Sequence, residues 1–563
     1  MEVPVNAEVE LVSKAHQAVP TIAVLACAWP ALLLATLCLL PFLNKPFLID
    51  DPWFLAMAQQ IVKHPAHPID FTVCPNFLGF AGACTKASTF ALGNPLLGQI
   101  GQGYILVPTV LAGAPEWAAH LTELLLAWIA ILAMTSLTLR LGWSRGHAIA
   151  GPLLLVAIPP FLAMASTAMP DILAATLAFV AMERIAAWKA EEKWSQGAAA
   201  AIALGLAGFA RPHLVLLLPL AAFFLLDSIH PREVLAQVRR EFWLWTPIIA
   251  GGCLLVVIML ALREHSPNVP PSYSNAYHWE HNLFTYFLFI AFPLPLAACW
   301  LVNRFGTRRR MTVVFVSAAA LIPWLCPISR SLAAAYSFAI FGCGALFGLL
   351  FEVLEKRDRS TQFLLLWLLV PLPIVYYMHF PIKYFLPCLP AVIFLCFRLM
   401  EGLPLRVGRM AALVAIVAYT GYSILILRSD EDFAEIGRNS LYELIAPHVA
   451  AGEQVWYSGT NWSNWYAPLA GAKLTYVGGP QPKRGDLLVD DVFAGGDELL
   501  ARFKHRTLVE TIHYQYRFGR TMGIFQVGGK KGVGVGLYSN GFGYWLWGFG
   551  EDPDDRFELW RVD

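Results

Sequence analysis

Long apolar runs separated by short polar loops make up the chain from residue 21 to residue 427. The first run, from Thr21 to Leu43, carries no charged residue. A membrane-spanning helix needs about 20 consecutive apolar residues, so this run predicts a span. Similar segments recur and predict a polytopic α-helical membrane protein. They are residues 21–43, 94–112, 117–139, 147–167, 171–188, 197–210, 212–227, 243–262, 283–303, 311–327, 332–354, 361–378, 384–400 and 410–427.

Lys and Arg are concentrated in the loops on one side of this series. These basic loops are residues 140–145, 189–193, 232–240, 304–310, 356–359 and 398–409. Cytoplasmic loops are enriched in Lys and Arg, so we expect this side to be cytoplasmic. Everything after Leu427 is then expected outside the cytoplasm, together with the loops around Asp171, Arg211 and Lys383.

One segment is expected not to cross the membrane. If the N-terminus is cytoplasmic, roughly fourteen crossings would place the C-terminal region on the wrong side. Residues 94–112 contain Pro, Gly and Gln at several positions. Such a broken, polar helix is tolerated at membrane depth only where it lines a cavity. We therefore expect about 13 transmembrane helices, with the N-terminus inside and the C-terminus outside.

Composition agrees with this class. The chain is 57% hydrophobic and 14% charged, with a mean hydropathy of +0.57. Soluble proteins of this length carry far more charge. The net charge of +1 gives no basic footprint for nucleic acid, so we expect a multi-pass protein in contact with membrane lipids. The first run reads as a retained anchor, and the C-terminus carries no eukaryotic retention signal, so a bacterial inner membrane is expected.

Two regions are more polar than the rest. In the loop 44–93, apolar residues within Pro52–Lys63 follow the spacing of an amphipathic helix lying in the membrane interface. Residues 428–563 predict a small extracytoplasmic α/β domain, separate from the membrane domain 1–427. Its expected elements are a helix at 433–449 and strands at 454–458, 473–477 and 486–490.

Asp50 and Asp51 follow the first span directly and stand just before Pro52. Two carboxylates at a membrane boundary are costly unless they are solvated, paired or used in function. A membrane enzyme could use one of them as a general base. The alternative is a solvated turn, in which Asp caps the next helix and Pro52 occupies its first turn.

Cations lie at several other outer positions. Arg211 interrupts a long apolar stretch, and a guanidinium there has the chemistry to hold a phosphate; the alternative is a turn with Arg211 reaching to water. Asp171 could act in the site or cap its own helix. Lys383, beside Tyr384, and Arg330 occupy similar outer positions, although Lys at a membrane edge is often an anchor. Together these residues suggest a phosphate held beside a base.

Cys74 and Cys84 differ from the other eight cysteines, which lie in or beside apolar segments and are interpreted as packing residues. Both lie in the loop 44–93, in a compartment that permits disulfides. We expect a disulfide between them. The alternative is a zinc site with His64 and His67, but these two lack the spacing of metal ligands.

These patterns resemble the GT-C glycosyltransferase superfamily, close to its protein O-mannosyltransferase and lipid A aminoarabinose transferase branch. The resemblance covers about residues 1–427 and rests on the order and sidedness of short motifs. Asp51 stands where the family usually has Glu, and Asn94 where it usually has His, so the acceptor side departs from the pattern. The motifs are Asp50-Asp51-Pro52-Trp53, Asn94-Pro95-Leu96, Ala168-Met169-Pro170-Asp171, Ala210-Arg211-Pro212 and Lys383-Tyr384 with Pro387 and Pro390.

The resemblance implies transfer of a sugar from a polyprenyl-phosphate donor to an acceptor hydroxyl on the outer membrane face. Asp50 would be the general base, with Asp51 assisting. Arg211, Lys383, Tyr384 and Arg330 would hold the donor phosphate; Asn94 and Asp171 would be acceptor-side or structural residues. No cofactor is expected, although an acidic pair can bind Mg²⁺. The sequence identifies neither the sugar nor whether the acceptor is protein, lipid or glycan.

Two other functions use the same polar groups. A transporter or flippase for polyprenyl-linked glycans would use them as a binding site, and a non-catalytic relative would only bind the lipid. The long outer loop, the outer domain and the expected lack of charges within spans argue against a transporter.

Overall fold

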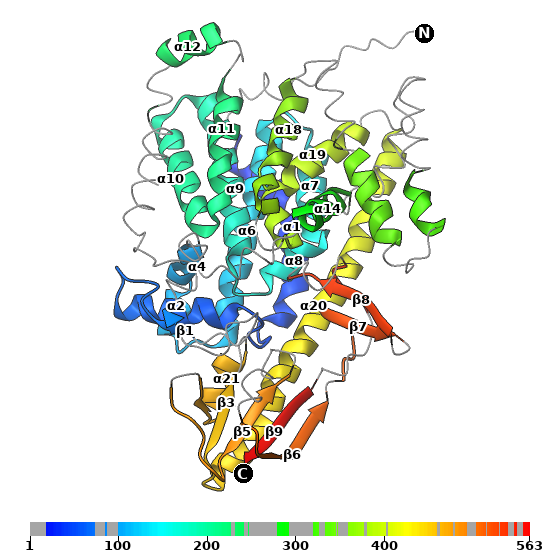
Figure 1. Ribbon diagram of the computed structural model, residues 1–563. Coiled ribbons are helices and arrows are strands. Elements are labelled where there is room, and N and C mark those ends of the chain that lie inside the picture. The colour runs from blue at the N-terminus through cyan, green and yellow to red at the C-terminus, as the bar shows by residue number, and fades with distance from the viewer. Residues whose placement is uncertain are drawn as a thin grey trace.

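The first apolar run forms α1 (Thr21–Leu39), continued by the short helix η1 (Leu40–Phe42), in the computed structural model of the chain (Figure 1). The structure describes residues 19–73, 85–86, 99–226, 231–240, 246, 279–291, 319–325, 333–344, 346, 359–376, 380–400, 404–458, 462–476, 479–492, 503–513, 515–527, 530–538, 545–548 and 556–563.

Small residues let the central helices pack closely. In α9 (Pro170–Glu191), alanines are buried against α6 (Glu116–Arg140) and α10 (Trp194–Ala210). A Cβ on Gly197 of α10 would lie 2.7 Å from the Trp188 ring of α9, so only glycine fits there. Such small-residue interfaces are typical of membrane helices, which gain little from hydrophobic burial against one another. Around this centre lie α11 (Leu217–Leu225), α14 (Trp279–Ala291), α18 (Arg359–Leu369), η5 (Leu372–Tyr376) and α19 (Leu389–Met400).

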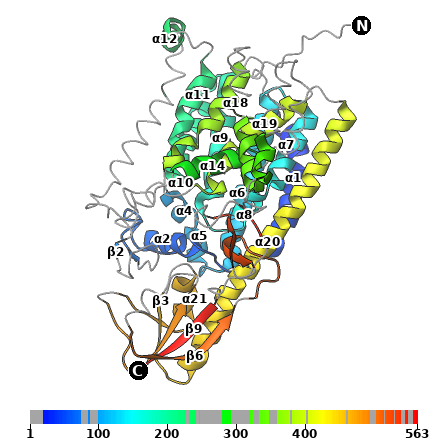
Figure 2. The same cartoon turned by 45° about the vertical axis from the view of Figure 1, so that its right-hand side comes forward.

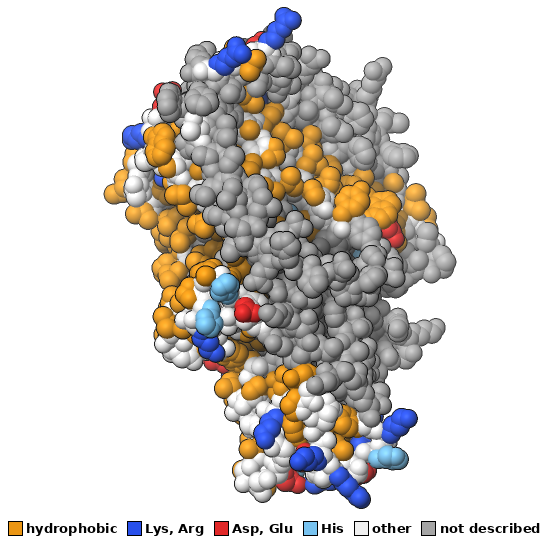
Figure 3. Space-filling model, turned by 60° about the vertical axis from the view of Figure 1, so that its left-hand side comes forward, with side chains coloured by type: hydrophobic (Ala, Val, Ile, Leu, Met, Phe, Trp, Pro, Cys, Tyr) orange, Lys and Arg blue, Asp and Glu red, His pale blue; other side chains and the backbone are white. Residues whose placement is uncertain are grey.

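The described bundle has the surface of an integral, multi-pass membrane protein. Within the described ranges, 4 helices are long and apolar enough to cross a membrane, or up to 5 if one bent pair counts as a span. Large apolar side chains such as Leu37 and Ile202 face outward. In Figure 3, hydrophobic side chains cover the described middle of the molecule, and Lys and Arg gather mainly toward its two ends. The four helices are Thr21–Phe42, Glu116–Arg140, Arg359–Tyr376 and Leu405–Ala450.

The segment expected as a span at 147–167 is bent rather than straight. The chain there forms α7 (Arg145–Ala157) and α8 (Pro159–Ala165), which meet at an angle of 65°. Ile158 between them has an extended backbone, because a residue before proline is driven out of the helical region. The bend directs the chain toward the turn before α9.

The described part of segment 94–112 forms two helices, α4 (Ile100–Ile105) and α5 (Val107–Leu111). With 6 and 5 residues, neither can cross a hydrocarbon core of about 30 Å, as the sequence predicts. A Cβ on Gly103 would meet the Met57 side chain at 2.7 Å, so α4 presses against the helix that carries Met57. Asn94 lies outside the described residues.

That helix, α2 (Asp51–Lys63), runs across one end of the bundle (Figures 1 and 2). Its apolar residues Phe54, Met57 and Ala58 are buried, which confirms the amphipathic helix predicted from their spacing. The helix brings its N-terminal residues to the boundary between the bundle and the C-terminal region.

The expected separation between a last span at 410–427 and a helix at 433–449 is wrong. A single helix, α20 (Leu405–Ala450), covers both and has 46 residues. No proline interrupts it before Pro447. Its polar residues Ser429, Asp430 and Asp432 are buried and bond to the C-terminal region, so the helix continues past the apolar stretch. In Figure 1 it runs diagonally from the bundle to the sheet.

The C-terminal region contains a five-stranded sheet in the order β4-β3-β5-β9-β6. β3 pairs in parallel with β4 and β5, whereas β9 is antiparallel to β5 and β6. Strands β3, β4 and β5 confirm the sequence prediction to within a few residues, whereas β6 and β9 were not predicted. The bounds are β3 Val455–Ser458, β4 Lys473–Leu474, β5 Leu487–Asp491, β6 Arg506–His513 and β9 Arg556–Val562, with the helix α21 Ser463–Leu469 after β3.

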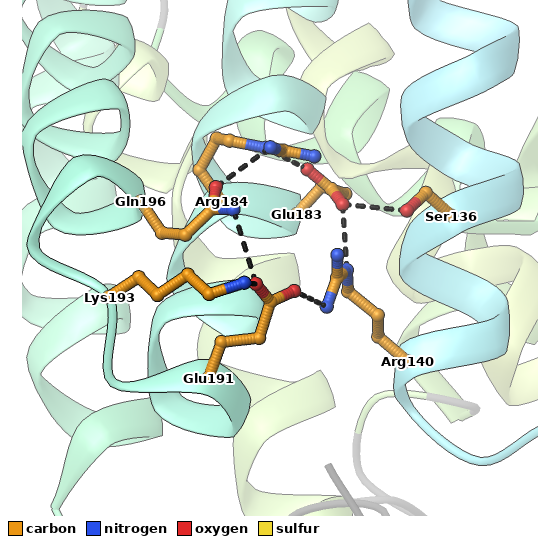
Figure 4. Close-up of polar contacts among 7 residues, drawn as sticks. All are labelled: Ser136, Arg140, Glu183, Arg184, Glu191, Lys193 and Gln196. Atoms are coloured by element: carbon orange, nitrogen blue, oxygen red, sulfur yellow. Dashed lines mark hydrogen bonds and ion pairs between the residues drawn. The ribbon is translucent and has the colours of Figure 1, made fainter. Parts of the chain in front are cut away.

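The far end of the bundle holds a polar cluster shown in Figure 4. Arg140 at the end of α6 pairs with Glu183 at 2.8 Å and with Glu191 at 3.0 Å. Ser136 also donates to Glu183, and Lys193 pairs with Glu191 at 3.0 Å. The cluster ties α6 to both ends of the α9–α10 turn. The basic helix α12 (Pro231–Arg240) lies at this same end (Figure 1).

Candidate active site

Asp50 and Lys383 face each other where α2 meets the bundle. Asp50 immediately precedes α2, and its side chain is 46% exposed. Lys383 lies in the short helix η6 (Ile382–Cys388) and is 4% exposed. The Lys383 Nζ and Asp50 Oδ2 atoms are 3.9 Å apart. The site therefore combines a carboxylate that solvent can reach with a cation that it scarcely reaches.

Asp51 has a different environment. It is fully buried, and its carboxylate accepts the backbone N–H groups of Leu48 and Ala168, each at 2.8 Å. Burial disfavours the charged form and raises the pKa of Asp51 to about 7, although the positive charge of Lys45 opposes the rise. Asp51 thus fixes two backbone segments and has no exposed face for a substrate.

The backbone before Asp50 is strained. Ile49 has a φ of 48°, a left-handed conformation that is rare for a β-branched residue. Such strain persists only where neighbouring contacts enforce it. Here Phe47 N–H donates to the Tyr466 hydroxyl at 2.7 Å, and Leu48 N–H donates to Asp51. These bonds fix the backbone before Asp50 and thereby the direction of the Asp50 side chain.

The turn between α8 and α9 is the centre of the site. Lys45 Nζ donates to the Ser166 hydroxyl at 3.0 Å, and the Ala168 N–H binds Asp51. The sulfur of Met169 lies 3.7 Å from Lys383 Nζ. Residues of one short turn thus contact Lys45 and Asp51, which follow the first span, and Lys383, which is distant from them in the chain.

Arg211 joins the site from the end of α10. It has an extended backbone, as expected before Pro212, and is 5% exposed. Its Nη2 lies 2.6 Å from Asp171 Oδ1, and its guanidinium carbon lies 4.7 Å from the centre of the Tyr384 ring. Tyr384 is the neighbour of Lys383 in the chain, so Arg211 contacts the residue that follows the second sequence-predicted cation.

Lys45 is a buried cation that the sequence reasoning did not single out. It is 1% exposed. Burial lowers its pKa, and the negative charges of Asp430, Asp51 and Glu431 act in the opposite direction. Its own carbonyl oxygen binds the His120 ring at 2.9 Å. Lys45 therefore sits between Asp51 of the bundle end and Asp430 of α20.

Glu123 and Gln102 form a further buried polar pair. Gln102 of α4 donates to Glu123 of α6 at 2.6 Å and to the Ala168 carbonyl at 3.0 Å. Both side chains are fully buried. Glu123 thus places an ionisable side chain in the N-terminal third of the 25-residue helix α6. The pair fastens the non-crossing segment to the central turn.

The C-terminal region supplies two more residues. Tyr538 and Thr521 donate their hydroxyl hydrogen bonds to Asp430 of α20. The Tyr538 ring lies 5.8 Å from Lys383 Nζ. No sequence signal pointed to Tyr538, because the contact depends on how the C-terminal region folds back on the bundle.

Several residues singled out from the sequence are not placed. Arg330, Asn94, Cys74 and Cys84 lie outside the described residues. The cysteines that the structure describes, among them Cys27 and Cys388, are free thiols. In the described ranges, no group of three or more His, Cys, Asp or Glu side chains is arranged to hold a metal ion.

No protein-family model and no curated protein sequence matches this chain. Its structure is similar to that of ArnT from Cupriavidus metallidurans bound to undecaprenyl phosphate, with 13% identity, a TM-score of 0.43, and coverage of 86% of this chain and 96% of ArnT. It is also similar to the Archaeoglobus fulgidus oligosaccharyltransferase tethered to an acceptor peptide, with 12% identity, a TM-score of 0.46, and coverage of 88% and 74%.

The apo state of the same ArnT gives 14% identity and a TM-score of 0.38, over 79% of this chain and 84% of that one. At these identities and TM-scores, the similarity assigns no substrate and no residue role to this chain.

Proposed function

We propose that this protein transfers a sugar from a polyprenyl-phosphate donor to an acceptor hydroxyl at the outer face of the membrane. The observation that carries the proposal is the 3.9 Å approach of a half-exposed carboxylate, Asp50, to a buried cation, Lys383. Arg211 lies over the ring of Tyr384, the residue that follows Lys383 in the chain. A base that solvent reaches, next to sheltered cations, suits attack by an acceptor on a sugar phosphate.

In the proposed reaction, Asp50 takes the proton of the acceptor hydroxyl as its oxygen attacks the anomeric carbon. The bond between that carbon and the phosphate oxygen breaks, and its electron pair leaves with the polyprenyl phosphate. The sugar is transferred with inversion. Asp51 supports this step by holding the turn before α2 through Leu48 and Ala168.

The cations stabilise the charge that grows on the leaving phosphate. Lys383 and Arg211 are both buried, and charge interactions are stronger where water is excluded. Asp171 orients Arg211 through the 2.6 Å contact. Arg330 and Asn94 keep their expected roles, in phosphate binding and acceptor binding, as parts of the proposal. No metal takes part in the proposed reaction.

The test is transfer from a radiolabelled polyprenyl-phosphate sugar to acceptors in isolated membranes, with purified protein in lipid nanodiscs. We expect Asp50→Asn to lower the rate by about 100-fold or more, since general-base catalysis contributes about 10²–10⁴-fold. Asp70→Asn is the matched control, because Asp70 is an exposed aspartate beyond the end of α2. Transfer is expected to persist in excess EDTA.

Other outcomes point to the other functions. Movement of labelled polyprenyl-linked sugar across the bilayer of sealed vesicles, without transfer, would identify a transporter; the buried Glu123 within α6 is the feature that such a protein would use. Binding of donor without transfer or movement would identify a non-catalytic relative. Equal transfer by wild type and Asp50→Asn would remove Asp50 as the base.

A further inference from the structure

The chain between β6 and β9 leaves the five-stranded sheet. These two strands are antiparallel neighbours, yet residues 514–555 separate them in the sequence; we name this stretch the insert. Its described part forms a separate hairpin of β7 (Met522–Val527) and β8 (Lys530–Gly536). Figures 1 and 2 show the hairpin beside α20, between the sheet and the bundle.

One short stretch of α20 anchors the insert. Ser429 donates to the Gly519 carbonyl at 2.6 Å. Asp432 accepts the Arg517 N–H at 2.6 Å and its Nε–H at 2.9 Å. Between them, Asp430 accepts the hydroxyls of Thr521 and Tyr538. All three anchoring side chains of α20 are buried, so these bonds form where loss of a partner is costly.

Tyr538 connects this anchor to Lys383. It is 3% exposed, its hydroxyl binds Asp430, and its ring lies 5.8 Å from the Lys383 ammonium. Burial and the nearby charge of Asp430 raise the pKa of Tyr538 well above its usual value, so the hydroxyl stays a donor. The ring therefore has a fixed place beneath the ammonium.

An aromatic ring holds a cation in a way that a carboxylate does not. The negative face of the ring attracts the ammonium but leaves its full charge available to another anion. Lys383 lies between such a ring and Asp50, whose 3.9 Å contact is long for an ion pair. An incoming phosphate can thus replace Asp50 as the partner of the Lys383 ammonium, while the Tyr538 ring keeps the ammonium in place.

We propose that the described part of the insert, up to Tyr538, belongs to the donor site, with Tyr538 as the residue that positions Lys383 for the donor phosphate and Asp430 as the residue that fixes Tyr538. The proposal rests on the proposed function, since it names a determinant of the same phosphate site. It gives the C-terminal region a direct role in donor binding.

The experiment measures the affinity of the full-length protein for undecaprenyl phosphate in detergent, for Tyr538→Phe and Tyr538→Leu. Tyr538→Phe keeps the ring but loses the bond by which Asp430 fixes it, so binding should weaken, but less than in Tyr538→Leu. Tyr538→Leu removes the ring and should weaken binding by about tenfold. Trp545→Leu is the matched control, because the Trp545 ring packs against Phe338 of the bundle at 5.9 Å; it should bind as wild type does.

A double-mutant comparison separates positioning from general stability. In a Lys383→Met background, Tyr538→Leu should cause no further loss of affinity, whereas a structural effect would add to the first loss. If Tyr538→Leu does not fold, Tyr538→Met takes its place. Wild-type affinity in Tyr538→Leu would overturn this inference and leave the proposed function unaffected. If the wild-type protein itself does not bind undecaprenyl phosphate, the proposed function fails and the inference fails with it.

Discussion

The carboxylates of Asp50 and Asp51, adjacent in the chain, lie in opposite environments. Asp50 is 46% exposed and faces Lys383, whereas Asp51 is completely buried and accepts two backbone N–H groups. The strained Ile49 and the start of α2 produce this division. Asp50 is thus available for chemistry, whereas Asp51 holds the backbone. Variants of the two residues should therefore behave differently.

Asp51 should make stability depend on pH. Its pKa is raised from 3.8 to about 7 in the folded protein. The folded state therefore keeps a proton that the unfolded state loses. This contribution to stability is fully present below about pH 4 and is lost as the pH rises to about 7. The total loss is on the order of 4 kcal/mol at about 1.4 kcal/mol per pKa unit.

Thermal unfolding of wild type and Asp51→Asn at several pH values checks this prediction. The difference between the two isolates the contribution of Asp51 from that of other carboxyl groups. We expect the wild-type Tm to fall relative to that of the variant between pH 4.5 and 7.5. Parallel pH curves would show that Asp51 does not titrate in this range.

The Arg211–Asp171 pair should have a structural role that can be separated from phosphate binding. Both residues are buried and lie 2.6 Å apart. Arg211→Met leaves a buried carboxylate without this partner and should destabilise the protein by about 3–5 kcal/mol. Adding Asp171→Asn removes the isolated charge and should restore most of the stability. Affinity for undecaprenyl phosphate should stay low in both variants.

Unfolding curves and binding measurements on the two variants decide the matter. Recovery of both stability and affinity in the double variant would show that Arg211 acts only through the fold. Lys189→Met serves as a control, since Lys189 binds the Phe224 carbonyl in another part of the bundle.

The cluster around Arg140 should contribute to stability but not to phosphate binding. Arg140→Met breaks contacts with Glu183 and Glu191 and should destabilise the protein by about 3 kcal/mol, because Glu183 stays buried. The cluster lies at the end of α6 remote from Asp50, so affinity for undecaprenyl phosphate should not change. Thermal unfolding and binding assays on the same preparation measure both effects. A loss of affinity in a fully folded variant would contradict the assignment of this end as purely structural.

The sequence predicts those site residues whose charged side chains are energetically costly at their position in the chain. Charges such as Arg211 and Lys383 interrupt apolar runs, and their expense in a membrane makes them visible without any structure. The amphipathic spacing of α2 likewise reports which face is buried. The structure brings Arg211 and Lys383 to the same turn, although their chemical roles remain proposals.

Long-range contacts are not visible in this way. Tyr538 is an ordinary aromatic residue in a glycine-rich stretch, and only the fold places it on Lys383. In the sequence, Lys45 has the position of an interfacial anchor, and only the fold shows that it is buried near Asp430 of α20. The continuity of α20 was missed because hydrophobicity falls after Leu427, and this fall resembles a domain boundary. Buried partners for Ser429 and Asp430 explain why the helix continues, and these partners lie about 90–110 residues away.

Cys74 and Cys84 should form a disulfide. They lie outside the described residues, but the chain on either side of them does not. β1 (Thr72–Val73) pairs antiparallel with β2 (Thr85–Lys86), and Val73 is opposite Thr85. Cys74 follows Val73 in the sequence and Cys84 precedes Thr85, so the pairing of these two neighbours supports the expected bond.

Closing this short loop should stabilise it by about 2–3 kcal/mol in the loop-entropy model. The loop follows α2, so the bond would steady the helix that begins directly after Asp50. Mass spectrometry of non-reduced peptides should find the two cysteines linked. Maleimide should label them only after reduction, whereas the buried Cys27 and Cys388 should need denaturant. Cys74→Ala and Cys84→Ala should lower Tm equally, and the double variant no further, because each single change already breaks the bond. Labelling of both thiols without reduction would contradict the prediction.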